Sequence, residues 1–292
     1  MQLSFAALDD LGLPAARAAA RRLLCNADQE ALGLCASRDL TVPGAEGPLR
    51  ARLYEPEGVA TPSAGLVFFH GCGFVVCDLE THDALCRRLA HAGRLRVLSV
   101  DYRLAPEAPC PAQHQDALAS AAWAFEHAAE LGMDPQRIGL AGDSAGAHLA
   151  LWTAPRLKAR GAPPRLLALL YPLVGMEDAE WAGNPVKDLR GIGRLAVAYI
   201  RKALGSEDAR AAVAISDSDL AGLPPVLLVG GGPDPVRPDG LRLAERLTAA
   251  GVPVQALAYP GLIHGGLNLT HLHEIPRRAL RETGEAAAAL LA

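Results

Sequence analysis

Gly142-Asp143-Ser144-Ala145-Gly146 decides how the rest of the sequence is interpreted. A strand is expected just before it, at residues 138–141, and a helix just after it, at residues 145–159. A serine at such a sharp turn must hold a strained backbone, and small residues two positions away let the strand and the helix approach. The turn also places Ser144 at a helix N-terminus, where the helix dipole favours negative charge. We therefore interpret Ser144 as a nucleophile rather than as part of an ordinary glycine-rich turn.

The same order of strand and helix repeats along most of the chain. Short apolar runs predict six buried strands, at residues 66–69, 97–100, 138–141, 166–170, 226–229 and 254–258. Helices are expected between or after them, at residues 79–92, 116–131, 145–159, 240–250 and 274–291. This alternation predicts an α/β fold with a mostly parallel central sheet flanked by helices.

Two segments interrupt the alternation. Residues 1–45 are rich in Ala, Arg and Leu and are expected to be helical, without a strand. Residues 175–222 separate two strands and contain one amphipathic helical pattern, at residues 194–204. Both segments are candidates for a helical cap over the carboxyl edge of the sheet, where open α/β folds bind ligands. Because no internal repeat or low-complexity linker is present, residues 1–292 are expected to form a single domain.

Composition excludes several classes of partner. Half of the 292 residues are hydrophobic, and the net charge is −4 without a basic block, which argues against nucleic acid. The first ten residues do not resemble a signal peptide, and the longest apolar stretch, residues 166–174, is too short to span a bilayer. We expect a cytoplasmic protein without stable membrane insertion. A homodimer is compatible with the sequence.

The six cysteines are interpreted as reduced thiols that serve as small apolar residues. They have no metal-ligand spacing, and all of them fall in the first 110 residues of a large chain: Cys25, Cys35, Cys72, Cys77, Cys86 and Cys110. Cys110, between two prolines, is expected in the core. Neither disulfides nor a metal site are expected.

A glycine-rich stretch, His70-Gly71-Cys72-Gly73-Phe74, follows the first of the six predicted strands. Glycine-rich backbone can present N–H groups to a developing negative oxygen, because few side chains obstruct the approach. One further N–H donor is expected from Ala145, the residue after the nucleophile. His70 is expected to support this loop and not to act as a base.

Three motifs together resemble the bacterial hormone-sensitive-lipase-like esterases, also called family IV, of the α/β-hydrolase fold. They are His70-Gly71-Cys72-Gly73, Tyr102-Arg103-Leu104-Ala105-Pro106-Glu107 and Gly142-Asp143-Ser144-Ala145-Gly146. The resemblance runs from about residue 49 to the C-terminus, and the helical N-terminus suits the cap of that family. It implies an oxyanion hole made by the N–H groups of Cys72, Gly73 and Ala145, with His70 and Gly71 supporting the loop. It also implies that residues 102–107 are a structural stretch near the active-site wall.

Cys72 and Cys77 depart from the family, which usually has glycine at both positions. A residue with a side chain at position 72 is expected to donate its N–H only at a negative φ. As a free thiol in this loop, Cys72 is expected to face the acyl pocket, so that a thiol reagent slows the enzyme.

A serine nucleophile needs a base, and the base needs an orienting acid. His264 is the candidate base, because it follows the last predicted strand in a flexible loop and resembles the C-terminal His-Gly-Phe of the family, with Gly266 in place of Phe. His148 lies one turn along the helix that follows the nucleophile and is interpreted as packing. His271 and His273 are expected on the surface.

Candidate acids lie in the loop after the strand predicted at residues 226–229. Asp234, in Gly232-Pro233-Asp234-Pro235-Val236-Arg237, matches the Asp-Pro-Leu-Arg stretch of the family. Asp239 is expected to cap the next helix. Asp217 and Asp219 precede the strand and are therefore at its wrong end. Asp143 is expected to hydrogen-bond within its own turn.

These residues predict a serine hydrolase that cleaves short to medium acyl esters through an acyl-enzyme, without a metal or cofactor. An amidase, deacetylase or acyltransferase remains an alternative, because ester and amide cleavage share this machinery. A non-catalytic small-molecule receptor on the same fold is a second alternative. The presence of His264 argues against the receptor, because the related plant receptors lack the catalytic histidine.

Overall fold

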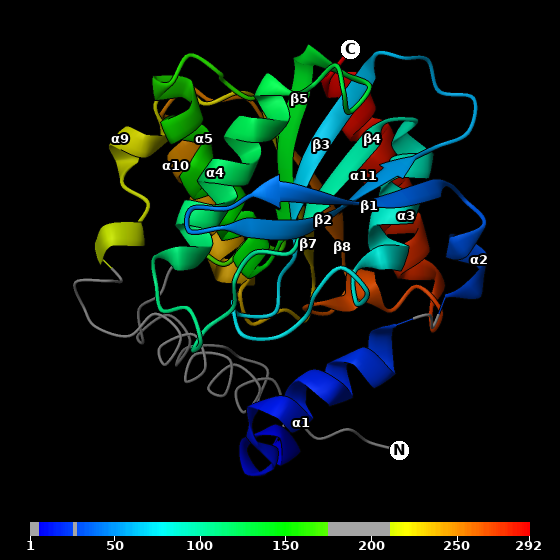
Figure 1. Ribbon diagram of the computed structural model, residues 1–292. Coiled ribbons are helices and arrows are strands. Elements are labelled where there is room, and N and C mark those ends of the chain that lie inside the picture. Colours follow the sequence, from blue (N-terminus) through cyan, green and yellow to red (C-terminus); the bar gives the residue numbers. More distant parts are fainter. Residues whose placement is uncertain (1–5, 26–27, 175–210) are drawn as a thin grey trace.

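The computed structural model describes residues 6–25, 28–174 and 211–292. Its centre is an eight-stranded sheet with the strand order β1-β2-β4-β3-β5-β6-β7-β8 (Figure 1). The strands are β1 (Ala36–Pro43), β2 (Pro48–Glu55), β3 (Ser63–Phe69), β4 (Arg96–Val100), β5 (Met133–Asp143), β6 (Leu167–Leu170), β7 (Val226–Gly231) and β8 (Val254–Tyr259). Strands β3 to β8 pair in parallel, whereas β2 is antiparallel to both β1 and β4. The predicted mostly parallel sheet is confirmed.

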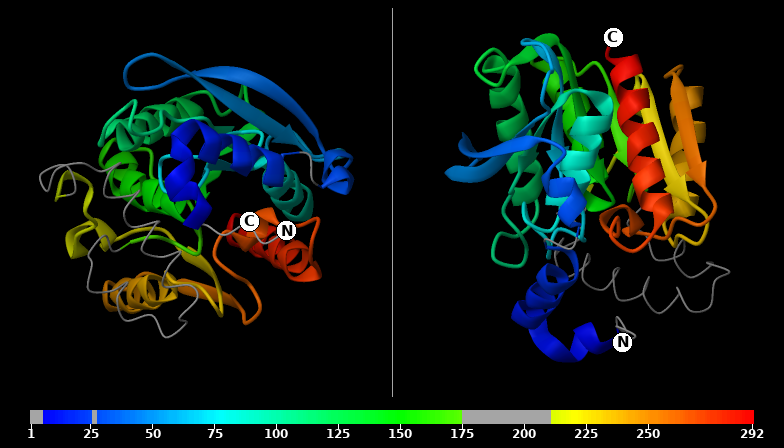
Figure 2. Two further views of the ribbon diagram at one scale, coloured as in Figure 1. Left: turned by 90° about the horizontal axis from the view of Figure 1, so that it is seen from below. Right: turned by 90° about the vertical axis from the view of Figure 1, so that its right-hand side faces the viewer.

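Helices cover both faces of the sheet, as the alternation predicted. The long ones are α1 (Ala6–Leu24), α3 (Asp83–Gly93), α4 (Ala112–Glu126), α5 (Ala145–Ala159), α10 (Arg237–Ala249) and α11 (Glu274–Leu290). The short ones are α2 (Gln29–Leu32), α9 (Asp217–Leu220) and the 3₁₀ turn η1 (Gly266–Asn268). Helices α3 and α11 lie together on one face, and α4, α5 and α10 lie on the other (Figure 2). Within the described ranges, no helix is long and apolar enough to cross a membrane.

The expectation that residues 1–45 contain no strand is wrong, because β1 occupies residues 36–43. This strand lies at the edge of the sheet and pairs only with β2. Along β1 only Val42 is buried, so the strand lacks the apolar run by which the parallel strands were recognised. By contrast, all seven residues of β3 are buried. The helical pattern at residues 194–204 lies outside the described residues.

The close approach of strand and helix around the serine turn depends on two glycines. A Cβ atom at Gly146 would lie 1.9 Å from the carbonyl oxygen of Phe69, and one at Gly142 would lie 2.4 Å from the backbone of Gly146. Both distances are impossible contacts, so the spacing of small residues in the motif has the packing role predicted for it. Helix α5 continues through Pro155 to Ala159, and the helix therefore does not end at this proline.

Helix α1 lies at the carboxyl edge of the parallel strands (Figures 1 and 2). Arg17 Nε donates to the carbonyl oxygen of Val75 at 2.9 Å, and its guanidinium forms an ion pair with Glu107 at 2.7 Å. Leu13 packs against Val75 and Ala105. The helix is therefore fastened directly to the loop that follows β3.

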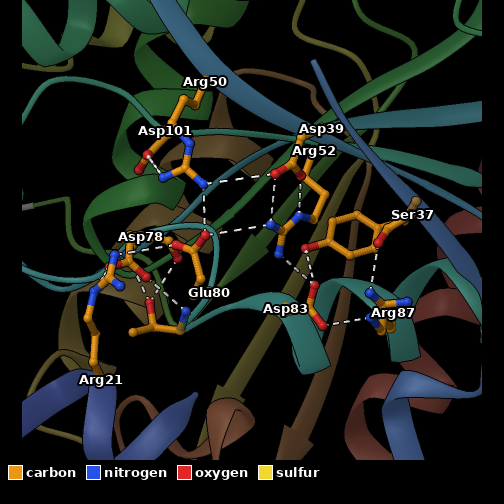
Figure 3. A network of polar contacts seen from close by, with 12 residues as sticks. Arg21, Ser37, Asp39, Arg50, Arg52, Asp78, Glu80, Asp83, Arg87 and Asp101 are labelled. Atoms are coloured by element: carbon orange, nitrogen blue, oxygen red, sulfur yellow. Dashed lines mark hydrogen bonds and ion pairs between the residues drawn. The ribbon is translucent and has the colours of Figure 1, made fainter. Parts of the chain in front are cut away.

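A network of charged side chains extends this attachment to the sheet (Figure 3). Arg21 of α1 pairs with Asp78, which follows the loop after β3, and its guanidinium also approaches Glu80 at 3.4 Å. Glu80 in turn pairs with Arg50 of β2 at 2.8 Å. Exposed pairs of this kind each contribute little, about 0–1 kcal/mol, but a connected set fixes the relative position of its elements more firmly.

Candidate active site

Ser144 occupies the turn between β5 and α5 with the strained backbone that its motif predicts. Its φ is 52° and its ψ −115°, a combination that for a non-glycine residue costs on the order of 1–3 kcal/mol. Two backbone hydrogen bonds to the end of β6 and to the residues just after it hold the turn: Ser144 N donates to Leu170 O at 2.8 Å, and Leu173 N donates to Ser144 O at 3.2 Å. Only 7% of Ser144 is exposed. The turn is therefore fixed by the sheet and presents the serine at the N-terminus of α5.

The structure brings the three predicted residues of the site together. Ser144 Oγ lies 2.9 Å from His264 Nε2, and His264 Nδ1 lies 3.0 and 3.1 Å from the two carboxylate oxygens of Asp234. Asp234 follows β7 and is oriented by the Val236 N–H, which donates to its Oδ1 at 2.8 Å. His264 lies between β8 and η1. Three loops at one edge of the sheet thus build a continuous hydrogen-bonded chain from hydroxyl to imidazole to carboxylate.

The charges around His264 favour its uptake of a proton. Burial, the largest influence, lowers the pKa of His264, but the charge and hydrogen bond of Asp234 outweigh it and raise the pKa above its ordinary value. The side chain is 29% exposed, so one edge of the ring remains open to the site. An Nδ1–H held by Asp234 leaves Nε2 free to accept the Ser144 proton, which is the arrangement that activates a serine for attack on a carbonyl.

The histidines that were not predicted to be the catalytic base lie in other environments. His148 is fully buried in α5, its Nε2–H donates to Val213 O at 3.1 Å, and burial lowers its pKa to about 4. It is therefore a neutral packing residue, as predicted. His273 is exposed and accepts a hydrogen bond from Ile275 N at the start of α11. His271 is half-buried, so it lies only partly on the surface.

Asp239 is not the N-cap of α10. The helix begins two residues earlier, at Arg237, so Asp239 lies inside its first turn. There it is buried and accepts a hydrogen bond from Val174 N at 3.2 Å. The helix dipole favours a carboxylate in the first turn of a helix, which explains why Asp239 is accommodated at this position. Asp217 and Asp219 belong to α9, on the other side of β7 in the chain, and bond to Arg246 and Ser216.

Residues 70–77 form the predicted oxyanion loop. Within the part of the chain that the structure describes, the N–H groups of Cys72, Gly73 and Ala145 donate no hydrogen bond, so they are available to a ligand. Cys72, Gly73 and Phe74 all have positive φ values, 71°, 66° and 66°. The expectation of a negative φ at Cys72 is therefore wrong, and two residues with side chains hold a backbone that glycine adopts more readily.

The interpretation of all six cysteines as reduced thiols is wrong for one pair. Cys72 and Cys77 form a disulfide across the oxyanion loop. The loop closes tightly because the N–H groups of Val75 and Val76 both donate to Cys72 O, and this turn brings the two Cα atoms to 5.9 Å. Cys72 is consequently not a free thiol, and the expected action of a thiol reagent on it does not follow. The cysteines outside this disulfide are Cys25, Cys35, Cys86 and Cys110, the last of them buried as expected.

Asp143 reaches out of its own turn, contrary to expectation. Its Oδ1 accepts the Gly71 N–H at 2.7 Å and lies 3.1 Å from His82 Nε2, while its Oδ2 accepts the Tyr171 hydroxyl at 3.3 Å. Burial, the largest influence, raises the pKa of Asp143, yet His82 and the Gly71 N–H together hold it below its usual value. An ionised, buried carboxylate thus ties the nucleophile turn to the oxyanion loop. This link was not predicted from the sequence, because no motif around His82 indicates it.

His70 and the stretch 102–107 support the same loop. The Tyr102 hydroxyl donates to His70 O at 2.7 Å, and the two rings stack with centroids 4.4 Å apart. Ala105 N donates to Phe74 O at 2.9 Å. Burial lowers the pKa of His70 to about 4, so this ring is uncharged near neutral pH. These contacts fit the supporting role expected of His70 and of residues 102–107.

Replacing Asp143 with alanine is expected to lower the free energy of unfolding by about 2–4 kcal/mol, because it leaves the buried Gly71 N–H and His82 without their acceptor. Urea denaturation followed by circular dichroism measures this difference. Asp143→Asn is the matched control: it keeps an oxygen for Gly71 and should lose less than half as much. Equal losses in the two variants would contradict the assigned role of the carboxylate contact to Gly71.

Comparison with known proteins identifies the family. A family sequence model described as alpha/beta hydrolase fold matches residues 66–268. The chain belongs to this family. The resemblance of its three motifs to the hormone-sensitive-lipase-like esterases is thereby confirmed, as is the predicted fold class.

Several relatives and solved structures to which this chain is similar are named esterases. The chain is 40% identical over 236 residues to the esterase LipI of Mycobacterium tuberculosis, covering 78% of this chain and 73% of the relative. It is 38% identical over 247 residues to the carboxylesterase NlhH of the same species, covering 82% and 76%. The structure matches a hyperthermophilic esterase from the archaeon Pyrobaculum calidifontis with a TM-score of 0.88 and 33% identity, over 96% of this chain and 94% of that one. It also matches EstE1, a thermostable carboxylesterase cloned from a metagenomic library, with a TM-score of 0.85 and 33% identity over 96% of each chain.

Proposed function

We propose that this protein hydrolyses carboxylic esters, with Ser144 as nucleophile, His264 as general base and acid, and Asp234 as the orienting carboxylate. The observation that carries the proposal is the unbroken hydrogen-bonded chain from Ser144 Oγ through His264 to Asp234. The names of the relatives, which are esterases and carboxylesterases, agree with this chemistry.

Acylation begins when Ser144 Oγ attacks the carbonyl carbon of the ester. His264 Nε2 takes the hydroxyl proton, and the resulting imidazolium is stabilised by Asp234. The carbonyl oxygen becomes negative in the tetrahedral intermediate and accepts hydrogen bonds from the unused N–H groups of Cys72, Gly73 and Ala145. The bond to the leaving alkoxide then breaks, and His264 returns the proton to it, which releases the alcohol.

Deacylation repeats the same steps with water. His264 removes a proton from water, the hydroxide attacks the acyl carbon, and the oxyanion is again held by the three N–H groups. Ser144 leaves with the proton from His264, and the carboxylic acid is released. This sequence requires no metal or cofactor.

We assign the acyl pocket to the carboxyl edge of the sheet, beneath a cap to which α1 contributes. Support comes from α1, whose Arg17 is hydrogen-bonded to the oxyanion loop at Val75 O. A cap fastened so near the oxyanion loop limits the length of an acyl chain beside Ser144. Short to medium acyl esters are therefore the proposed substrates.

Hydrolysis of p-nitrophenyl esters, from acetate to long acyl chains, tests the proposal. Turnover is expected for short and medium chains and is expected to decline for long ones. An organophosphonate should label the protein once, on the peptide that contains Ser144. A p-nitroanilide with the best acyl group separates an esterase from an amidase. Absence of both ester hydrolysis and labelling would contradict the proposal, and faster cleavage of the anilide would favour the amidase alternative.

A further inference from the structure

We infer that the disulfide between Cys72 and Cys77 positions the oxyanion loop for catalysis, so that its reduction lowers kcat more than it changes KM. The inference rests on the proposed ester hydrolysis for its kinetic readout. Cys72 supplies one of the proposed oxyanion donors, and Cys77 closes the far end of the loop.

Backbone geometry is the first observation that carries the inference. Cys72 and Cys77 both have a φ of 71°, and Phe74 between them has a φ of 66°. Residues with side chains rarely adopt this left-handed region and remain there only where their surroundings leave no alternative. A covalent bond between the first and last of these residues supplies such a constraint, whereas a glycine would need none.

The second observation is how the rest of the loop is held. Contacts from outside the loop fix both sides of Cys72: Asp143 accepts the Gly71 N–H, and Ala105 donates to Phe74 O. The main-chain bonds that Cys72 itself receives come from Val75 and Val76, inside the loop. Among the described residues, the disulfide is thus the link that prevents Cys72 and its N–H from turning away while its neighbours stay in place.

Accessibility makes the bond open to reduction. Cys72 is partly exposed, whereas Cys77 is buried. A dithiol such as dithiothreitol attacks Cys72 Sγ as its thiolate, the S–S bond breaks, and the Cys77 thiolate leaves and takes up a proton. The second thiol of the reagent then releases Cys72 as a thiol. Two electrons and two protons pass to the protein, and the reagent becomes a cyclic disulfide.

Reduction is expected to lower kcat by about 10- to 100-fold, less than the 10²–10³ that complete removal of one oxyanion donor brings. KM should change by less than about threefold, because these donors act on the oxyanion of the transition state and not on the bound ester. A loop with a merely structural role would not separate kcat from KM in this way. Removal of the dithiol and reoxidation should restore kcat.

Two double variants distinguish a positioning role of the disulfide from an effect of the free thiols that reduction creates. Cys72→Ser with Cys77→Ser cannot form the bond and keeps side chains at both positive-φ positions, so its kcat should match that of the reduced wild type. Cys72→Gly with Cys77→Gly also lacks the bond but tolerates this backbone, so its kcat should exceed that of the serine variant by at least about tenfold. Neither variant should respond to dithiol. Cys25→Ser, at a free and partly buried thiol, is the matched control and should respond as the wild type does.

Counting thiols and measuring hydrogen exchange complete the test. Alkylation under denaturing conditions should modify four cysteines before reduction, in agreement with the four that lie outside the disulfide, and all six cysteines after it. Amide exchange in the peptide spanning residues 70–77 should become faster on reduction.

Six thiols before reduction, an unchanged kcat in the reduced enzyme, or a fully active serine variant would each overturn the inference. An oxidised enzyme that hydrolyses no ester would contradict the proposed function instead. In that case the exchange measurement decides: unchanged exchange overturns the positioning role, and faster exchange supports it.

Discussion

Ser144→Ala is expected to lower kcat/KM for p-nitrophenyl acetate by on the order of 10⁶, to a small residual rate. The alanine removes the atom that would attack the carbonyl, and His264 Nε2 loses the hydroxyl that lies 2.9 Å away. The unused N–H groups of the oxyanion loop and of Ala145 remain, so a residual acceleration over water of about 10³–10⁴ is expected. Steady-state kinetics at high enzyme concentration and loss of organophosphonate labelling are the measurements.

Ser218→Ala is the matched control for this substitution. Ser218 is an exposed residue of α9 whose Oγ contacts only Ser216 among the described side chains. Its replacement should leave kcat/KM and labelling unchanged. Substantial ester hydrolysis by Ser144→Ala, with an unaltered melting temperature, would show that another group is the nucleophile.

The parallel part of the sheet was predictable because its signals are local. Each of the six parallel strands, β3 to β8, contains a short apolar run, although the edge strand β8 is mostly not buried. The edge strand β1 was missed for the opposite reason. One of its faces is exposed and the other is only partly covered, so Val42 is its single buried residue and the run looks no different from a loop or helix.

The catalytic residues were proposed from motifs that occupy a few consecutive positions. Ser144 and its flanking glycines are one such motif, and the chain order of serine, acid and histidine reduced the remaining choice to a few loops. The supporting contacts were missed because their partners are distant in the sequence. Asp143 and Gly71 are 72 positions apart. Neither motif indicates that the Asp143 carboxylate accepts a hydrogen bond from the Gly71 N–H.

The disulfide illustrates a different difficulty. Cys72 and Cys77 are only five positions apart, yet spacing alone does not distinguish a disulfide from two thiols. The decisive fact is the tight turn, in which Val75 and Val76 both donate to Cys72 O and reverse the chain. The expectation that all six cysteines are reduced thiols was therefore overruled by local geometry.

Asp234→Asn is expected to lower kcat by on the order of 10⁴ while preserving the fold. The amide can retain an oxygen for the Val236 N–H, so the loop after β7 keeps its hydrogen bond. An amide directed at His264 Nδ1 no longer fixes the tautomer in which Nε2 accepts the Ser144 proton, and it does not stabilise the imidazolium. Kinetics with p-nitrophenyl acetate, together with the melting temperature, measures the effect. Asp217→Asn, which alters an exposed acid paired with Arg246, should behave as the wild type.

The pH dependence gives this substitution a second, independent signature. In the wild type the neutral imidazole is the active form, so kcat/KM should fall as pH decreases through a pKa above the ordinary histidine value of about 6.5. Burial by itself lowers the pKa of His264, and Asp234 reverses that effect. Removing the negative charge therefore moves the acidic limb of the profile to lower pH, even as the maximum rate drops. An acidic limb that stays in place in Asp234→Asn would mean that the titrating group is not the imidazole paired with Asp234, and the assignment of this carboxylate would have to be abandoned.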